Sequence, residues 1–249
     1  MYPGGKNGAG VYQSIINQMP PHRNYIEGFL GSGAILRTKR PAISSIGIDA
    51  DGDVLTAFSG DGIPNLQLIQ ADAITWLAAA HAENSDTISP NTLVYLDPPY
   101  LISTRSSHRP IYRCELTEAD HLRLLRVIQN LPCMIIISGY KSAMYEKELV
   151  SWRVETFQTT NRAGGRTTEY LWMNFPTPIE LHDYRFLGIN FRERERIKRK
   201  KIRWINRLKS MDSLERYALM EIIEELRGDH HTINDDTTRW CNNAGNSEA

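Results

Sequence analysis

The stretch "NYIEGFLGSG" (24–33) indicates the fold more clearly than any other part of the chain. Its first half is typical of a β-strand, and its second half is a glycine-rich turn directly before a helical stretch. Glycines in such a turn let the backbone bend tightly and approach a ligand closely. A glycine-rich turn is common, so the sequence on either side decides what this one does.

Short apolar strands alternate with helical stretches on both sides of this turn. We expect strands at 24–30, 44–49, 66–72, 92–97 and 133–140, and helices at 10–19, 51–58, 71–82 and 116–131. Residues 152–175 are typical of two strands around a Gly-Gly loop. This rhythm predicts an α/β fold, a doubly wound and mostly parallel sheet closed by an antiparallel hairpin.

A change of character follows this predicted domain. Pro176-Thr177-Pro178 marks a boundary, and Asn190 with Glu193 resembles a capping box that opens a basic helix. A second helix is predicted to stop at Gly228. We therefore predict a domain over 1–178, a helical hairpin over 190–227 that binds DNA, and a disordered tail over 229–249.

Composition limits the class of protein. The longest apolar runs fall far short of the roughly 18 residues of a membrane span, and no secretory signal is visible, which predicts a cytoplasmic protein without a membrane partner. The three cysteines are too far apart for a metal or disulfide role. Net charge is zero, but residues 192–209 carry ten basic and two acidic side chains, which predicts a polyanionic partner for this segment.

Acidic residues end the strands that follow the glycine-rich turn. Asp49 lies 18 residues beyond Gly31, near the spacing of roughly 20 at which a doubly wound fold places an acid on a ribose. Asp72 ends the third strand, where it can accept a hydrogen bond from a purine amino group. Because no phosphate-binding lysine motif is present, these acids predict a nucleoside-bearing cofactor other than ATP.

The fourth strand ends in "VYLDPPY" (94–100). Pro99 has no amide hydrogen, and the two prolines fix the local backbone. The Asp97 carboxylate and the Pro98 carbonyl can therefore both point outward as acceptors beside the Tyr100 ring. Two acceptors and a ring suit a planar group that carries an NH2.

These motifs, in this order, resemble those of the D12-class N6-adenine DNA methyltransferases over about residues 1–175. The matching segments are "YPGGK" (2–6), "EGFLGSG" (27–33), "DPPY" (97–100), "TEADH" (117–121), "SGY" (138–140) and "TEYLW" (168–172). The resemblance implies transfer of a methyl group from S-adenosylmethionine to a flipped-out adenine in double-stranded DNA. It implies catalysis by Asp97, Pro98, Pro99 and Tyr100, and cofactor binding by Tyr2, Gly5, Lys6, Glu27, Phe29, Gly31, Gly33, Asp49 and Asp72.

The chain departs from the family in two ways. Gly28 stands where the family usually has proline, and only 24 residues separate Asp72 from Asp97, which leaves no room for a large recognition insert. In this the chain resembles compact phage and prophage methylases. We therefore predict DNA contacts from short loops and from the basic helix, at Arg105, Arg109, Arg113, Asn161, Arg162, Arg166, Arg199, Lys200 and Arg203.

Three other functions fit the same residues. The acceptors at Asp97 and Pro98 would also serve the amino group of cytosine N4, or of an adenine in RNA. A DNA-binding module that kept the fold without the activity is the third, although the intact "DPPY" segment disfavours it. The motifs predict neither the recognition sequence nor the oligomeric state.

Overall fold

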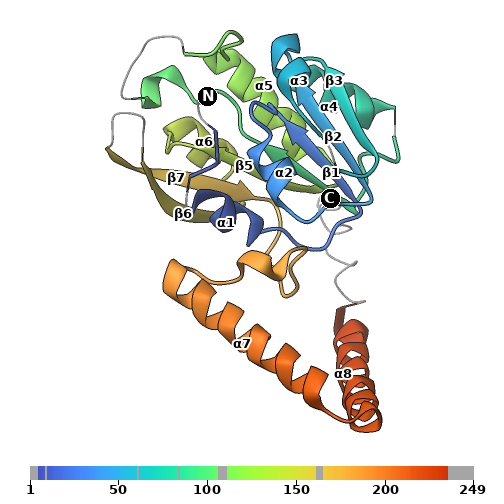
Figure 1. Cartoon of the computed structure of the whole chain (residues 1–249). Coiled ribbons are helices and arrows are strands. Elements are labelled where there is room, and N and C mark those ends of the chain that lie inside the picture. Colours follow the sequence, from blue (N-terminus) through green and yellow to red (C-terminus); the bar gives the residue numbers. More distant parts are fainter. Residues whose placement is uncertain are drawn as a thin grey trace, which may run out of the picture. The chain divides into compact units, whose positions relative to one another are not determined.

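The computed structural model describes residues 5–8, 10–60, 62–83, 85–105, 111–160 and 165–234. The chain forms two compact units, Met1–Ile189 and Asn190–Ala249. Figure 1 shows a sheet with helices on both faces in the first unit and two long helices in the second. Each unit is described below by itself.

The first unit contains one seven-stranded sheet in the order β3-β2-β1-β4-β5-β7-β6. Strands β1 to β5 are parallel, and β7 runs antiparallel to both β5 and β6. The predicted doubly wound sheet with a closing hairpin is confirmed. The strands are β1 (Asn24–Gly28), β2 (Ser44–Asp49), β3 (Leu66–Gln70), β4 (Thr92–Leu96), β5 (Met134–Gly139), β6 (Arg153–Thr160) and β7 (Arg166–Met173).

Helices cover both faces of this sheet because alternate strand residues point to opposite sides. In β4, Val94 and Leu96 belong to one apolar cluster, and Leu93 and Tyr95 to the other. All five residues of β4 are buried. The helices are α1 (Val11–Ile16), α2 (Ala34–Thr38), α3 (Gly52–Ala57), α4 (Ala73–Ala82), α5 (Glu118–Gln129) and α6 (Ala143–Glu148), with 3-10 turns at Ile102–Thr104 and Tyr184–Phe186.

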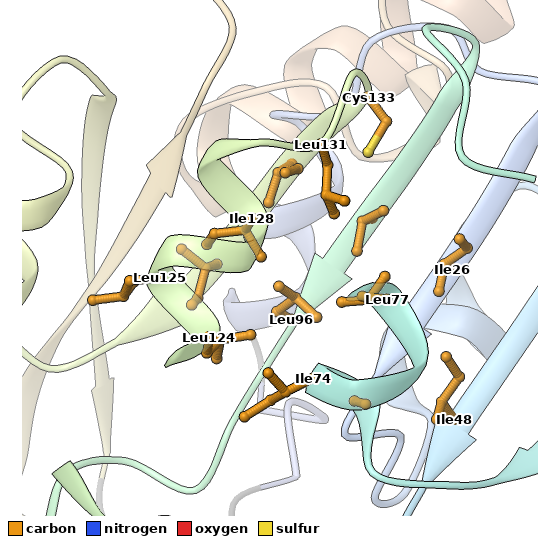
Figure 2. Close-up of a cluster of buried hydrophobic side chains, with 14 of the residues drawn as sticks. Ile26, Ile48, Ile74, Leu77, Leu96, Leu124, Leu125, Ile128, Leu131 and Cys133 are labelled. Atoms are coloured by element: carbon orange, nitrogen blue, oxygen red, sulfur yellow. The ribbon is translucent and has the colours of Figure 1, made fainter. Parts of the chain in front are cut away.

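Helices α4 and α5 make the larger cluster. Figure 2 shows Ile74 and Leu77 of α4 and Leu124 and Ile128 of α5 converging on Leu96 of β4. These side chains are at most 1% exposed. Burying such a side chain fully stabilises the fold by about 1.5–3 kcal/mol, so this cluster holds the central strand and its carboxyl end in place.

The second unit consists of α7 (Phe191–Ser210) and α8 (Ser213–Asn234). Asn190 caps α7 as predicted, since its side chain accepts a hydrogen bond from the Glu193 amide at 2.9 Å. The predicted end of α8 at Gly228 is wrong, because the helix continues to Asn234. Residues 235–249, most of the predicted tail, lie outside the described residues.

Helix α7 buries none of its side chains. Trp204 and Ile205 are 51% and 49% exposed. The basic side chains Arg199, Lys200 and Arg203 are also exposed. The described part of this unit therefore presents both charged and apolar side chains to its surroundings.

Candidate active site

The carboxyl ends of the parallel strands meet at one edge of the sheet, where such folds bind ligands. A cavity of about 600 Å³ lies there. This volume is within the usual range for small-molecule sites. Most of the predicted cofactor and catalytic residues line it: Gly5, Lys6, Glu27, Phe29, Gly31, Asp49, Asp72, Asp97 and Pro99.

The glycine-rich turn that follows β1 forms one wall of the cavity. Phe29, Gly31 and Gly33 all have positive φ angles, of 59°, 50° and 60°. A Cβ atom at Gly33 would lie 2.2 Å from Cε2 of Phe58, so only glycine fits there. Gly33 thus lets the turn pack closely against Phe58. This role differs from the ligand contact predicted for Gly33.

Asp49 connects the ends of β1 and β2. Its Oδ2 accepts a hydrogen bond from the Gly31 amide at 2.9 Å, and its Oδ1 accepts one from the Asp51 amide at 2.9 Å. Burial raises the pKa of this carboxyl, and these amides partly offset the shift. The predicted ribose contact would use the lone pairs that remain on the two oxygens.

Asp72 is the N-cap of α4. Its Oδ1 accepts from the amide and the hydroxyl of Thr75, at 2.7 and 2.6 Å, and lies 3.2 Å from Nη2 of Arg123. The side chain is 41% exposed. Asp72 reaches the cavity, but much of its hydrogen-bonding capacity serves the start of α4.

Asp97 follows β4 directly and is held by two donors. Its Oδ1 accepts from the Ser138 hydroxyl at 2.8 Å and lies 2.9 Å from Nζ of Lys6. The side chain is 20% exposed. Pro98, whose carbonyl is predicted to be a second acceptor, is buried.

The Tyr100 hydroxyl is fixed from two sides. It accepts from Nζ of Lys6 at 2.8 Å and donates to Oε2 of Glu169 at 3.1 Å. Its ring meets the Tyr140 ring edge-on, with 4.6 Å between the centroids. The hydroxyl is therefore used for positioning, and the residue as a whole is half-buried.

Lys6 contacts two carboxylates, because its Nζ also lies 3.4 Å from Oε2 of Glu169. The Lys6 side chain is only 7% exposed. Burial by itself would lower the pKa of Lys6, but Asp97 and Glu169 raise it above its ordinary value. The ammonium therefore stays charged.

The segment after "DPPY" turns inward. Arg105 is 8% exposed, donates from Nε to the Tyr100 carbonyl at 2.6 Å, and binds Glu115 with both terminal nitrogens, at 2.8 and 2.6 Å. Burial disfavours the Glu115 charge, but the Arg105 contact and two amide hydrogen bonds lower the pKa of Glu115 to about 2. The DNA contact predicted for Arg105 does not fit this arrangement, since the guanidinium already holds the active-site loop.

Arg113 lines the cavity. Its Nη1 is 3.1 Å from Oδ1 of Asp51 and also binds Asp53. The side chain is 70% exposed, so a contact with DNA would require it to leave these two acids. Arg166 begins β7 and is exposed. Tyr2, Arg109, Asn161 and Arg162 lie outside the described residues.

Sequence reasoning did not assign roles to three residues that hold the site. Ser138 binds Asp97, Glu169 binds Lys6 and Tyr100, and Glu115 binds Arg105. Ser138 and Glu169 do lie in the family-like segments "SGY" and "TEYLW". Ser138 lies near the carboxyl end of β5, and Glu169 lies on the neighbouring strand β7. These positions in the sequence motifs could have indicated that both residues lie close to Asp97.

Within the described ranges, no helix is long and apolar enough to span a membrane. The same residues contain no cluster of three or more His, Cys, Asp or Glu side chains that could hold a metal ion.

Residues 66–161 match the family model of the D12 class N6 adenine-specific DNA methyltransferases. This match confirms the family predicted from the motifs. It indicates an adenine methyltransferase that uses S-adenosylmethionine. No curated protein sequence matches the chain.

Several solved structures are similar to this chain. Precorrin 8w decarboxylase from Methanobacterium thermoautotrophicum has 12% identity and a TM-score of 0.43, covering 70% of this chain and 94% of its own. The 23S rRNA methyltransferase ErmE has 11% identity and a TM-score of 0.43, and the match covers 79% of this chain and 75% of ErmE. A SAM dependent methyltransferase from Archaeoglobus fulgidus has 12% identity and a TM-score of 0.41, and the match covers 65% of this chain and 90% of that protein. We base the fold on the sheet order and not on these likenesses.

Proposed function

We propose that the protein transfers a methyl group from S-adenosylmethionine to N6 of an adenine that is rotated out of double-stranded DNA. The observation that carries this proposal is the single cavity that Asp97 shares with the glycine-rich turn and Asp49. An acceptor for an amino group and a wall for a nucleoside cofactor thus face the same space.

The residues present fit the cofactor. Glu27, Asp49 and Asp97 give the cavity acidic groups, which suit a ligand with a sulfonium, an ammonium and ribose hydroxyls. The turn at Phe29–Gly31 would lie along its adenosine, and Asp49 would hold the ribose. When bound, the cofactor supplies an electrophilic methyl group.

Asp97 makes the target nitrogen reactive by position and not by strong basicity. The lone pair of an adenine amino group is delocalised into the ring, so the nitrogen is a poor nucleophile. Hydrogen bonds from both its hydrogens, to Asp97 and to the Pro98 carbonyl, favour a pyramidal nitrogen whose lone pair faces the cofactor side of the cavity. The extra proton can leave after transfer, when the nitrogen is cationic.

Tyr100 provides the surface for the base. The N6 atom of adenine is paired inside a duplex, so the nucleotide must rotate out before it can react. Stacking on an aromatic ring is worth about 1–3 kcal/mol per base. Since Lys6 and Glu169 fix the hydroxyl, the ring is held in one orientation before the base arrives.

DNA contacts in this proposal come from Arg166 on the β6–β7 hairpin and from Arg199, Lys200 and Arg203 on α7, which are exposed. Arg109, Asn161 and Arg162 remain predicted contacts. Arg105 is assigned to positioning the loop. The likeness to compact phage methylases remains a prediction from the sequence.

The direct test is methyl transfer from labelled S-adenosylmethionine to DNA, followed by digestion to nucleosides and mass spectrometry. We expect N6-methyladenine with the wild type and almost none with Asp97→Ala. The matched control is Asp86→Ala, which removes an exposed acid that does not line the cavity.

Each alternative gives a different result in the same assay. N4-methylcytosine would identify a cytosine enzyme, and transfer to RNA but not to DNA would identify an RNA enzyme. DNA binding without cofactor binding or transfer would identify a silent module. Full turnover by a folded Asp97→Ala variant would refute the catalytic assignment.

A further inference from the structure

The contacts of Lys6 account for all three of its ammonium hydrogens. A lysine ammonium has three donors and no acceptor. Its Nζ lies 2.9 Å from Asp97 Oδ1, 2.8 Å from the Tyr100 hydroxyl and 3.4 Å from Glu169 Oε2. Only the first of these partners is a residue that binds the target amino group.

The two oxygens of Asp97 are in different situations. Oδ1 already accepts from Ser138 and Lys6. Among the residues that the structure describes, none forms a hydrogen bond or ion pair with Oδ2. An amino group that enters the cavity therefore finds Oδ2 as its acceptor. Because Lys6 binds the same carboxylate, that amino group arrives beside the Lys6 ammonium.

The chemistry of the base fits a donor in this place. In adenine the amino group is flanked by two ring acceptors, N1 and N7, and in cytosine by N3. A carboxylate oxygen next to an ammonium thus matches an amino hydrogen next to a ring nitrogen. Each hydrogen bond to a charged group contributes about 1.5–3 kcal/mol.

We propose that Lys6 donates a hydrogen bond to the ring nitrogen beside the target amino group, so that Lys6 and Asp97 recognise the base at two points. This inference rests on the proposed function, since its ligand is the rotated base. Lys6 exchanges Asp97 Oδ1 for the ring nitrogen and keeps Tyr100 and Glu169.

Glu169 is a positioning residue in this arrangement. It lies on β7 with its side chain 8% exposed, and it contacts both Lys6 and Tyr100. One ammonium and two carboxylates carry a net charge of −1. Glu169 therefore offsets the repulsion that Lys6 alone would exert on a target nitrogen that becomes cationic during transfer.

The test is a double-mutant cycle between the enzyme and the base. The enzymes are the wild type and Lys6→Met, and the duplexes carry adenine, 1-deazaadenine or 7-deazaadenine at the mapped target position. We expect the wild type to lose about tenfold to a hundredfold in kcat/KM on one deaza-base. On adenine, kcat/KM of Lys6→Met should be lower than that of the wild type by a similar factor. Replacing adenine with that deaza-base should lower kcat/KM of Lys6→Met only slightly further. Any intrinsic change in reactivity of the deaza-base affects both enzymes and cancels.

Two further variants sharpen the cycle. Glu169→Gln should reduce the coupling and shift the pH profile of kcat/KM, which a purely structural role would not do. Lys147→Met removes an exposed lysine of α6 and should leave every value unchanged. If Lys6→Met does not fold by circular dichroism, Lys6→Gln replaces it, with a shorter neutral donor.

The outcomes separate this inference from the function on which it rests. A wild type that forms no N6-methyladenine refutes the proposed function. An active wild type with strictly additive losses in the cycle overturns the Lys6 inference alone. Loss of S-adenosylmethionine affinity in Lys6→Met, again without coupling to the base, would assign Lys6 to the cofactor carboxylate, as the sequence resemblance suggests.

Discussion

Glu27 is a buried acid of the cavity whose pKa lies far above its ordinary value. It is 3% exposed, and its Oε2 accepts from the Tyr25 hydroxyl at 2.8 Å. Burial raises the pKa of Glu27 to about 8, with a smaller contribution from Asp97. Without a cationic ligand in the cavity, this carboxyl is therefore mostly protonated near pH 7.

This pKa shift predicts a pH dependence of folding. In the unfolded chain Glu27 ionises near pH 4.5, so its neutral form stabilises the fold below that pH and this stability is lost as pH rises through 8. Glu27→Gln keeps the acceptor for Tyr25 and cannot ionise. We expect the melting temperature of the variant, relative to the wild type without cofactor, to rise steadily from pH 5 to pH 8.5.

Thermal unfolding monitored by circular dichroism at several pH values measures this difference. Other buried groups, such as His22 with its pKa lowered to about 2, contribute equally to both proteins and cancel. A difference in melting temperature that does not change with pH would show that Glu27 is already ionised in the folded protein.

The position of a residue can be predicted from sequence where a motif and a strand end coincide. Asp49 ends β2 and Asp97 follows β4, so the sheet brings both to one edge. The partners of Asp97 were harder to predict, because Lys6 lies 91 positions before it and Ser138 lies 41 positions after it. Local sequence patterns do not predict which of such distant segments come into contact.

At the scale of elements, the glycine-rich turn between β1 and α2 offers a controlled test of packing. Gly33 and Gly62 both have positive φ angles, 60° and 81°. A Cβ atom at Gly33 would collide with Phe58, whereas one at Gly62 would meet nothing within 4 Å. The two positions therefore differ in steric room and not in backbone conformation.

Gly62→Ala should cost about 1–3 kcal/mol of unfolding free energy through backbone strain. Gly33→Ala should cost about 1–3 kcal/mol more through overpacking, and should also weaken S-adenosylmethionine binding because the turn must shift. Urea denaturation and calorimetric titration measure the two effects. Equal stability losses at both positions would contradict the contact with Phe58.

Elements themselves were predicted well because the apolar strands and capping residues are local signals. Thr117 and Asp120 form the capping box that begins α5, and Asp72 caps α4. Loops were predicted less well. The basic residues after "DPPY" suggested DNA contacts, but Arg105 instead binds Glu115, a partner that composition does not reveal.

At the scale of the whole molecule, charge is distributed unevenly along the chain. Residues 1–100 carry five basic and nine acidic side chains, whereas 192–209 carry ten basic and two acidic. Most residues that line the cavity lie in the acidic stretch, and the basic stretch lies on α7. From this difference we predict that α7 increases affinity for the DNA backbone, while the residues around the cavity carry the chemistry.

Replacing Arg199, Lys200 and Arg203 with glutamine should weaken binding to all duplexes alike. Each lost phosphate contact should lower the salt slope by about 0.9, and therefore by up to about 2.7 for three, without changing the methylated sequence. Fluorescence anisotropy at several salt concentrations measures the slope.

The control variant replaces Arg126, Lys141 and Lys147, exposed residues of the first unit, with glutamine and so makes the same change in net charge. Weaker binding to the target duplex alone would make α7 a reader of bases. An unchanged slope would mean that α7 does not touch DNA.

Helix α7 buries no side chain fully. Because most helical stability in proteins comes from packing of a buried face, α7 receives little of it, and like charges four positions apart, as at Arg199 and Arg203, weaken the helix further. Phosphates would screen that repulsion, so we expect α7 to gain order if it binds DNA. Part of the binding free energy would then be spent on folding the helix, and α7 would be fully helical only on the duplex.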